Sequence, residues 1–436
     1  MDFEEKLIGI SVKMSNNKYL KAISDSFIQF MPFTTIGALA TLWTSVIVND
    51  TTGLGALWSP IMKLSVLNPA FTMLNFVTLG CISLGVAFLI GMNIGERNGM
   101  NEKFTGLVSV ASFFAVLNNT TTVADADGNV LSTITGVFSN QLGSQGLFTA
   151  MIIGILATEL VTWLYSKDAL KIKLPEQVPP QISKSFEQII PGFIAVLAFG
   201  LLSVLCVNTT GKYLSDVILQ FIQKPLMNVG TSLPGLIVFL AVIGLLWSLG
   251  LHGDNMLNGI INPILITAVA ENLELVNAGL TPTNIINQPF RRIFSCTGGT
   301  GMVLSLTLAI FLFAKRPENR SIAKVAIVPN LFNIGEINMF GLPVVLNPVL
   351  IIPFIIAPVV STIVGYVLTV IGICPIMYIQ APWTLPPFLY GWVASGGNIM
   401  GGVCQLICVA VCVIVYAPFI KMLERQQAKA EAENQD

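Results

Sequence analysis

Long runs of apolar residues, separated by short polar segments, dominate the chain. The longest run extends from Ile337 to Ile420 and has 84 residues without Asp, Glu, Lys, Arg or His. Because about 20 apolar residues cross a bilayer as a helix, this run has room for about three crossings or more. Shorter runs of the same kind lie at Ser26–Asn49, Leu64–Gly95, Phe104–Ala124, Gly128–Thr158, Gln188–Gly211, Pro225–Leu251 and Ile293–Ala314.

The apolar runs are continuous and do not alternate at every second position, which favours helices over membrane β-strands. We therefore predict an all-α polytopic membrane protein with about ten transmembrane helices. Within 128–165 the number of crossings stays open, because Gly143 to Gly146 can break one long segment into two.

The most polar internal stretch is 166–187, where Pro175, Pro179 and Pro180 exclude a continuous helix. Ile182 to Ile190 is expected to form an amphipathic helix on the membrane surface. We place the domain boundary here, between an N-terminal domain of residues 1–180 and a C-terminal domain of residues 181–436.

Two segments of the C-terminal half mix prolines, glycines, asparagines and charges into an apolar frame, at 254–300 and at 328–354. Irregular backbone at membrane depth is tolerated only where it is buried in protein or lines a cavity. Interrupted segments of this kind indicate the substrate site of a carrier. We therefore expect re-entrant segments here.

Composition narrows the class of protein further. Charged residues make up 10% of the chain, hydrophobic residues 54%, and the mean hydropathy is +0.77, whereas soluble proteins carry about 25% charged residues. This excludes a soluble enzyme and a disordered protein. With 22 Lys and Arg against 23 Asp and Glu, the chain lacks the basic face of a nucleic-acid binder. The seven cysteines lie in apolar contexts without His or carboxylate partners, so we expect neither a metal nor a cofactor.

The few charges are unevenly placed. Lys and Arg gather at 6–21, 97–103, 167–184, 291–292, 315–324 and 421–429, and the positive-inside rule assigns most of these clusters and both termini to the cytoplasm. The segment 118–128 has two aspartates and no base, so we place it outside.

His252 is the only histidine in the chain, and it lies in WSLGLHGDNM at 247–256. One interpretation is a helix-end histidine at the level of the lipid headgroups. The other is a sugar or proton ligand, favoured by the neighbouring Trp247, Asp254 and Asn255.

Glu336 stands directly before the 84-residue uncharged run. A charge at the centre of a membrane segment costs about 2.5–3.5 kcal/mol on insertion scales, so such a residue is retained for a pathway, a reaction or a partner. We predict that Glu336 is a buried carboxylate that accepts a proton. A structural ion pair is the alternative.

Other polar and aromatic side chains leave alternatives open. Glu96 and Arg97 end a span and have the character of a cytoplasmic anchor. Trp247 and Trp383 are either interfacial residues or sugar-stacking platforms. Neutral amides are frequent in the interrupted segments and hydrogen-bond hydroxyls without requiring a charged ligand, which favours a polyol as the substrate.

NIGEINMFGLPVVLNP at 333–348 resembles the signature of enzyme IIC, the membrane subunit of sugar phosphotransferase systems of the lactose, cellobiose and diacetylchitobiose type. WSLGLHGDNM resembles the histidine segment of this family. Further segments are similar to its other landmarks, namely KAISDSFIQFMPFTTIGA at 21–38, IGERNGM at 94–100 and LPEQVPPQISKSFEQIIPGF at 174–193.

This resemblance implies a homodimer in the bacterial cell membrane, with ten membrane helices and two re-entrant hairpins in each chain. The N-terminal domain would form the dimer scaffold, and the C-terminal domain would hold a β-linked disaccharide such as cellobiose or diacetylchitobiose. His252 and Glu336 would contact the C6 hydroxyl that becomes phosphorylated. Further sugar contacts would come from Trp247, Trp383, Asn255, Arg97 and Asn140.

The phosphoryl donor implied by the resemblance is a phosphocysteine of a cytoplasmic enzyme IIB, itself charged by enzyme IIA. Because no cysteine here lies in a phosphate-cradling loop, we place that cysteine on a separate subunit. The alternative is a proton-coupled secondary sugar transporter that uses Glu336 and His252 without phosphorylation. A membrane glycosyl transferase is a weaker third interpretation, because no carboxylate cluster is evident.

Overall fold

The computed structural model describes residues 17–50, 54–124, 130–175, 177–342, 344 and 347–433. The chain divides into two compact units. The first, here called the hairpin unit, contains the described residues of Ser15–Thr34 and Phe76–Met227. The second, here called the histidine unit, contains the described residues of Thr35–Asn75 and Asn228–Asp436. Helices α2 (Lys18–Leu42) and α4 (Asn68–Thr78) each begin in one unit and end in the other.

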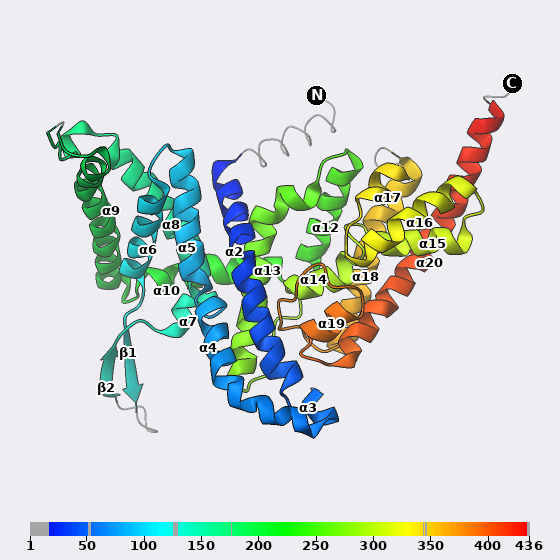
Figure 1. The fold of residues 1–436 in the computed structure, drawn as a ribbon, viewed down its shortest axis with the longest axis horizontal. Coiled ribbons are helices and arrows are strands. Elements are labelled where there is room, and N and C mark those ends of the chain that lie inside the picture. The colour runs from blue at the N-terminus through cyan, green and yellow to red at the C-terminus, as the bar shows by residue number, and fades with distance from the viewer. Residues whose placement is uncertain are drawn as a thin grey trace. The chain divides into compact units, whose positions relative to one another are not determined.

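The hairpin unit is built on packed helices that small residues bring close together (Figure 1). At Gly91 of α5 an added Cβ would lie 2.6 Å from the Cβ of Ser109 on α6, so the two helices approach with little room between their backbones. Asn101 begins α6 by accepting hydrogen bonds from the backbone N–H groups of Lys103 and Phe104. The main elements are α5 (Ile82–Arg97), α6 (Glu102–Val116), α7 (Ser139–Leu142), α8 (Leu147–Tyr165), α9 (Pro180–Thr210), α10 (Leu214–Ile218) and α11 (Lys224–Gly230), the last of which ends in the other unit.

A two-stranded antiparallel hairpin interrupts this helical unit (Figure 1). Strand β1 (Thr120–Ala124) pairs with β2 (Val130–Thr135), with Thr120 opposite Thr135. Both strands are rich in β-branched residues, which favour extended backbone. The apolar runs of the sequence did not predict this hairpin. Asp125 and Asp127, which suggested an external loop, lie outside the described residues.

The histidine unit contains the longest of the described helices, α20 with 35 residues, and two apolar cores. One core surrounds Phe354 and Tyr416, and the other surrounds Phe290 and Phe294. Helix α20 packs against α15, α18 and α19. The elements are α3 (Leu54–Leu57), α12 (Leu233–Ser248), α13 (Gly253–Asn277), α14 (Gln288–Ser295), α15 (Val303–Phe313), α16 (Pro317–Leu331), α17 (Glu336–Gly341), α18 (Pro348–Val370), α19 (Leu389–Ala394) and α20 (Ile399–Glu433).

Seven helices among the described residues are long and apolar enough to cross a membrane, and a bent pair adds an eighth if it is counted as one span. The prediction of about ten crossings is not settled by this number. Within the ambiguous region 128–165, a single candidate span runs over Ser144–Tyr165. The other six are Lys18–Ile47, Ser59–Arg97, Pro180–Thr210, Gly253–Asn277, Val349–Val370 and Ile399–Ala428.

The structure refines the predicted boundary region. Residues 171–175 have no regular structure, as the prolines predicted. Residues 182–190, expected as a separate surface helix, instead form the first turns of α9, which continues to Thr210. Along the chain, the last boundary between the structural units falls between Met227 and Asn228, and the predicted domains with their roles of scaffold and transport domain stay predictions.

The interrupted segments also behave differently from each other. The first contains the long helix α13, which continues through Pro263, and after a break at Asn277 the eight-residue helix α14. The second is broken as expected, since α16 ends at Leu331, α17 has only six residues and α18 begins at Pro348.

Candidate functional site

Three of the predicted site residues, Trp247, His252 and Asn255, lie in or beside the turn between α12 and α13. A fourth, Glu336, begins α17. A fifth, Trp383, lies in the chain segment before α19. All five belong to the histidine unit.

His252 is the N-cap residue of α13. Its Nδ1 accepts a hydrogen bond from the backbone N–H of Asn255 at 3.2 Å. A neutral imidazole with Nδ1 as acceptor carries its proton on Nε2, so the free edge of the ring presents an N–H donor. Gly253 lets α13 start against α12, because a Cβ there would lie 2.5 Å from the carbonyl oxygen of Ile243.

Trp247 packs on His252, with ring centroids 4.4 Å apart and planes inclined by 47°. Its side chain is 5% exposed, so in this structure it supports the imidazole and has little free surface for stacking on a sugar. Trp383 is 38% exposed and is the better placed of the two tryptophans for such stacking. The side chain of Asn255 is also exposed.

Asp254 joins the histidine turn to two other elements. Its carboxylate forms an ion pair with Arg291 of α14 and accepts a hydrogen bond from the hydroxyl of Thr300. It also accepts one from the indole N–H of Trp247 at 3.4 Å. The side chain of Arg291 is fully buried and that of Asp254 is 12% exposed, so the pair is largely removed from solvent.

A glycine-rich loop, Thr297–Met302, lies between these groups and the Glu336 segment. The backbone N–H of Gly298 donates to Oδ1 of Asn333 at 2.8 Å. At Gly299, with φ of +114°, an added Cβ would lie 3.1 Å from the backbone of Gly335. The loop therefore packs against Asn333 and Gly335, which lie three positions and one position before Glu336.

Asn333 extends this connection to the Trp383 segment. Its Nδ2 donates to the carbonyl oxygens of Trp383 at 2.7 Å and Leu385 at 3.1 Å. Its backbone has φ of +63°, a left-handed conformation that asparagine tolerates better than most residues. Beneath it, Thr307 donates to Asn330 at 2.6 Å and accepts from Asn338 at 2.7 Å.

Glu336 is the first residue of α17, and its side chain is exposed. The prediction that it is a buried carboxylate is therefore wrong for this structure, because α16 ends before it and leaves the start of α17 at a surface. Among the described residues Glu336 takes part in no ion pair. This leaves its carboxylate available to a ligand.

Arg97 and Asn140 belong to the hairpin unit. Arg97 ends α5, where it pairs with Asp25 at 2.5 Å and donates to the carbonyl oxygen of Lys18 at 3.2 Å, as an anchoring residue would. Asn140 of α7 donates to Gln145 at 3.1 Å. It lines a cavity of about 270 Å³ together with other amide side chains.

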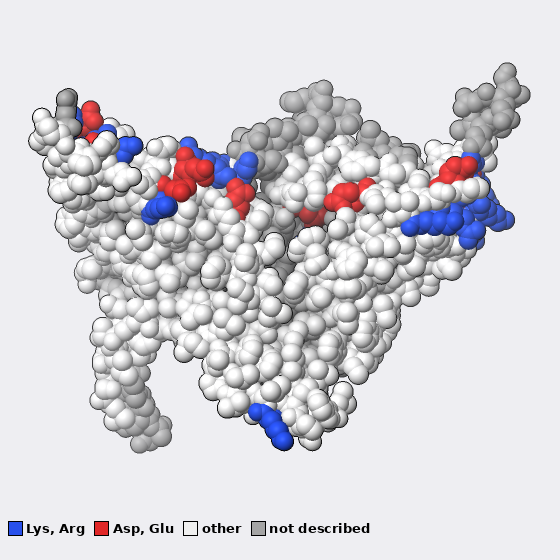
Figure 2. Space-filling view, viewed as in Figure 1, with Lys and Arg blue, Asp and Glu red and all other residues white. Residues whose placement is uncertain are grey.

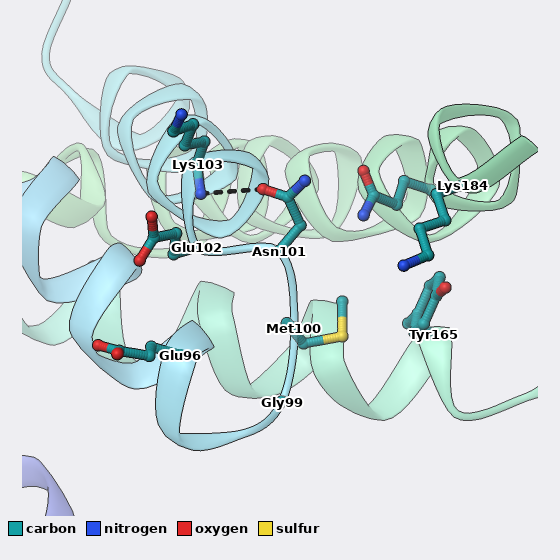
Figure 3. Close-up of a pocket in the computed structure, with 9 residues that line it drawn as sticks. Glu96, Gly99, Met100, Asn101, Glu102, Lys103, Tyr165 and Lys184 are labelled. Carbon is teal, nitrogen blue, oxygen red and sulfur yellow. Dashed lines mark hydrogen bonds between the residues drawn. The ribbon is translucent and has the colours of Figure 1, made fainter. Parts of the chain in front are cut away.

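A larger cavity, of about 560 Å³, opens where α5, α6, α8 and α9 end or begin (Figure 3). Two carboxylates and two ammonium groups line it, from Glu96, Glu102, Lys103 and Lys184. None of the predicted site residues lines it, so its volume does not mark the site that the sequence indicates.

Sequence reasoning missed the residues that connect the site. Asp254 was noted only as a neighbour of His252, and Arg291 was grouped with cytoplasmic loop charges. In the structure the side chain of Arg291 is fully buried against Asp254. The one available signal was the presence of an acid and a base in interrupted segments of a chain with 10% charged residues; their pairing depends on the fold.

Apolar helices of spanning length and a polar site built on interrupted segments define a polytopic membrane protein of the transporter type. The family model described as Phosphotransferase system, EIIC, matches residues 24–358, and the chain belongs to this family. The predicted family and the all-α polytopic membrane fold are thereby confirmed. Membership of the family implies a sugar substrate and an EIIB partner.

Individual relatives match along nearly the whole chain. The oligo-beta-mannoside-specific EIIC component of Bacillus subtilis is 32% identical over 433 residues, covering 98% of this chain and 94% of its own length. The cellobiose-specific EIIC component of Lactococcus lactis is 28% identical, with 96% of each chain covered. The crystal structure of ChbC, the IIC component of the N,N'-diacetylchitobiose-specific system, superposes with a TM-score of 0.90 at 30% identity, covering 98% of this chain and 99% of that one.

Proposed function

We propose that this chain binds a β-linked disaccharide, carries it across the cell membrane and presents its C6 hydroxyl to phosphorylated enzyme IIB. The names of the relatives favour cellobiose, an oligo-β-mannoside or diacetylchitobiose as the sugar. The 181–436 domain would bind the sugar, the 1–180 domain would form the scaffold of a homodimer, and Arg97 and Asn140 would add sugar contacts. Both termini would lie in the cytoplasm.

The reaction assigns different roles to Glu336 and His252. The C6 oxygen attacks the phosphorus of the phosphocysteine, the P–S bond breaks, and the cysteine leaves as a thiolate. The carboxylate of Glu336 takes the hydroxyl proton as the oxygen attacks. The Nε2–H of His252 donates to the hydroxyl oxygen and orients it. The exposed face of Trp383 packs on a sugar ring.

The observation that carries this proposal is the continuous set of contacts from His252 to Glu336. Trp247, Asp254, the glycine-rich loop and Asn333 link the two segments, and Asn333 also holds the backbone of Trp383. An imidazole, a carboxylate and an indole from distant parts of the sequence are thereby borne on one connected framework, which suits the recognition of a single hydroxyl-rich ligand.

Transport into membrane vesicles tests the proposal. Vesicles that contain this chain are loaded with phosphorylated enzyme IIB and given labelled cellobiose or diacetylchitobiose. We expect labelled sugar phosphate to accumulate inside, at a rate that does not change when a protonophore is added. Accumulation of free sugar that a protonophore abolishes would instead establish the proton-coupled transporter.

A further inference from the structure

We propose that Asp254 and Thr300 are positioning residues, which hold the glycine-rich loop as a spacer of defined length between His252 and Glu336. This inference rests on the proposed function, because it concerns how the two reacting groups are brought to one hydroxyl. Neither side chain needs to touch the sugar to act in this way.

At one end, the glycine-rich loop is attached to the histidine turn through the hydrogen bond between Thr300 and Asp254. Asp254 is the second residue of α13, two positions after His252, and its carboxylate contacts Trp247, Arg291 and Thr300. Trp247 in turn packs on the imidazole. A shift of the Asp254 carboxylate would therefore move Trp247, which supports the imidazole of His252, and the turn that carries His252.

At its other end, the glycine-rich loop is attached to the residues before Glu336. Two hydrogen bonds join Gly298 to this segment, one from its N–H to Asn333 and one to its carbonyl oxygen from Asn330 at 3.4 Å. The close approach of Gly299 to Gly335 fixes the separation of the two backbones. The loop thus contacts the residue directly before Glu336.

The glycine-rich loop is itself closely packed. Gly298, Gly299 and Gly301 have φ between +82° and +114°. Added Cβ atoms would collide with Leu304 at Gly298 and with Phe354 at Gly301, and at Gly299 a Cβ would be tightly packed against Gly335. The hydroxyl of Tyr416 also donates to the carbonyl oxygen of Gly301 at 2.5 Å. A loop packed this closely transmits a displacement from one end to the other, because dense packing leaves little room for local adjustment.

A purely stabilising role explains the Asp254–Arg291 pair less well. Buried ion pairs contribute little net stability unless the remaining donors are satisfied, and here Nε and Nη1 of Arg291 have no hydrogen-bond partner among the described residues. The pair does fix the direction of the Asp254 carboxylate, which is what a positioning role requires.

Thr300→Val is the sharpest test, because it removes one hydroxyl and keeps the ion pair, the loop glycines and the volume of the side chain. Thr300→Ser restores the hydroxyl. Thr267→Val is the matched control: Thr267 is buried in α13, and its hydroxyl donates only to the carbonyl oxygen of Pro263 in the same helix. Each full-length variant is reconstituted in vesicles. Its sugar dissociation constant is measured without enzyme IIB, its phosphotransfer kcat with phosphorylated enzyme IIB, and its thermal unfolding midpoint separately.

We expect Thr300→Val to lower kcat by about tenfold to a hundredfold, since misplacement of a reacting group by about 1 Å has effects of this size, while the sugar dissociation constant changes by less than about threefold. Thr300→Ser should recover most of the lost kcat.

A kcat of Thr300→Val equal to that of Thr267→Val would overturn the inference. Parallel losses of sugar binding, kcat and thermal stability in Thr300→Val that Thr300→Ser does not rescue would also overturn it. If the wild-type protein imports only free sugar, both the proposed function and this inference are wrong. If the wild-type protein phosphorylates the sugar and Thr300→Val does so at the same kcat, only the inference is wrong.

Discussion

His252 and Glu336 are held by the fold in different ways. His252 is tied to the backbone, because its Nδ1 caps α13 and its ring packs on Trp247. Glu336 is exposed at the start of a six-residue helix. Replacing the histidine therefore disturbs local structure and chemistry together, whereas replacing the glutamate changes chemistry with little effect on packing.

Glu336→Gln should separate sugar binding from phosphotransfer. Glutamine keeps the size and polarity of the side chain but does not accept the hydroxyl proton, so we expect phosphotransfer to fall by about a hundredfold or more and the sugar dissociation constant to stay within a few fold. Equilibrium binding and single-turnover transfer from phosphorylated enzyme IIB measure the two effects. Glu318→Gln, on another exposed carboxylate with a side chain that is 68% exposed, is the control. Wild-type transfer by Glu336→Gln would refute the proton-acceptor role.

His252→Ala should weaken both binding and transfer, and it should also destabilise the protein. Loss of an N-cap side chain lowers the free energy of unfolding by about 0.5–2 kcal/mol. His252→Asn keeps a capping oxygen and lacks the Nε2–H donor, so we expect it to lose sugar binding while it retains most of the thermal stability. Unchanged binding and uptake in both variants would leave His252 with a structural role only.

At the scale of elements, the apolar runs predicted where helices lie and missed what joins them. Spans such as α8 and α18 follow from hydropathy alone, because lipid leaves the backbone few alternatives to a helix. The β1–β2 hairpin escaped notice since Thr120 to Ala124 continues an apolar run. The contacts of Asp254 with Arg291 and Thr300 join residues that lie 37 and 46 positions away along the chain, and no local pattern predicts such a pairing.

Asn333 connects the glycine-rich loop with the chain segment of Trp383 and Leu385, and substitutions can test this connection. Asn333→Ala removes hydrogen bonds to Gly298, Trp383 and Leu385 and places alanine in a left-handed conformation, which costs about 1–2 kcal/mol more than for glycine or asparagine. Asn333→Gly removes the same bonds without that backbone cost. We expect both to lower the thermal unfolding midpoint in detergent, alanine more than glycine, and both to reduce phosphotransfer. Equal midpoints for alanine and wild type would show that the joint contributes nothing to the fold.

At the scale of the whole molecule, the charges of the hairpin unit predict which ends of its helices face the cytoplasm. Lysines and arginines predominate where α5 and α8 end and where α6 and α9 begin, and Figure 2 shows them there together with acidic residues. Lys18, near the start of α2, lies at the same end, since its carbonyl oxygen accepts from Arg97. The hairpin follows the opposite end of α6 and leads into α8. From the positive-inside rule we predict that the lysine-rich end and the beginning of α2 face the cytoplasm and that the hairpin faces outward.

Single cysteines at the two ends test this direction. In a background where the partly exposed Cys81 and Cys206 are replaced by serine, Ile134→Cys marks the hairpin and Lys173→Cys marks the segment before α9. Ile134 is 48% exposed, so its replacement is accessible to reagents. In intact cells that express the chain, we expect a membrane-impermeant maleimide to label Ile134→Cys and to label Lys173→Cys only after the membrane is opened. The opposite pattern would invert the topology and move the basic end to the outer surface, away from any cytoplasmic enzyme IIB.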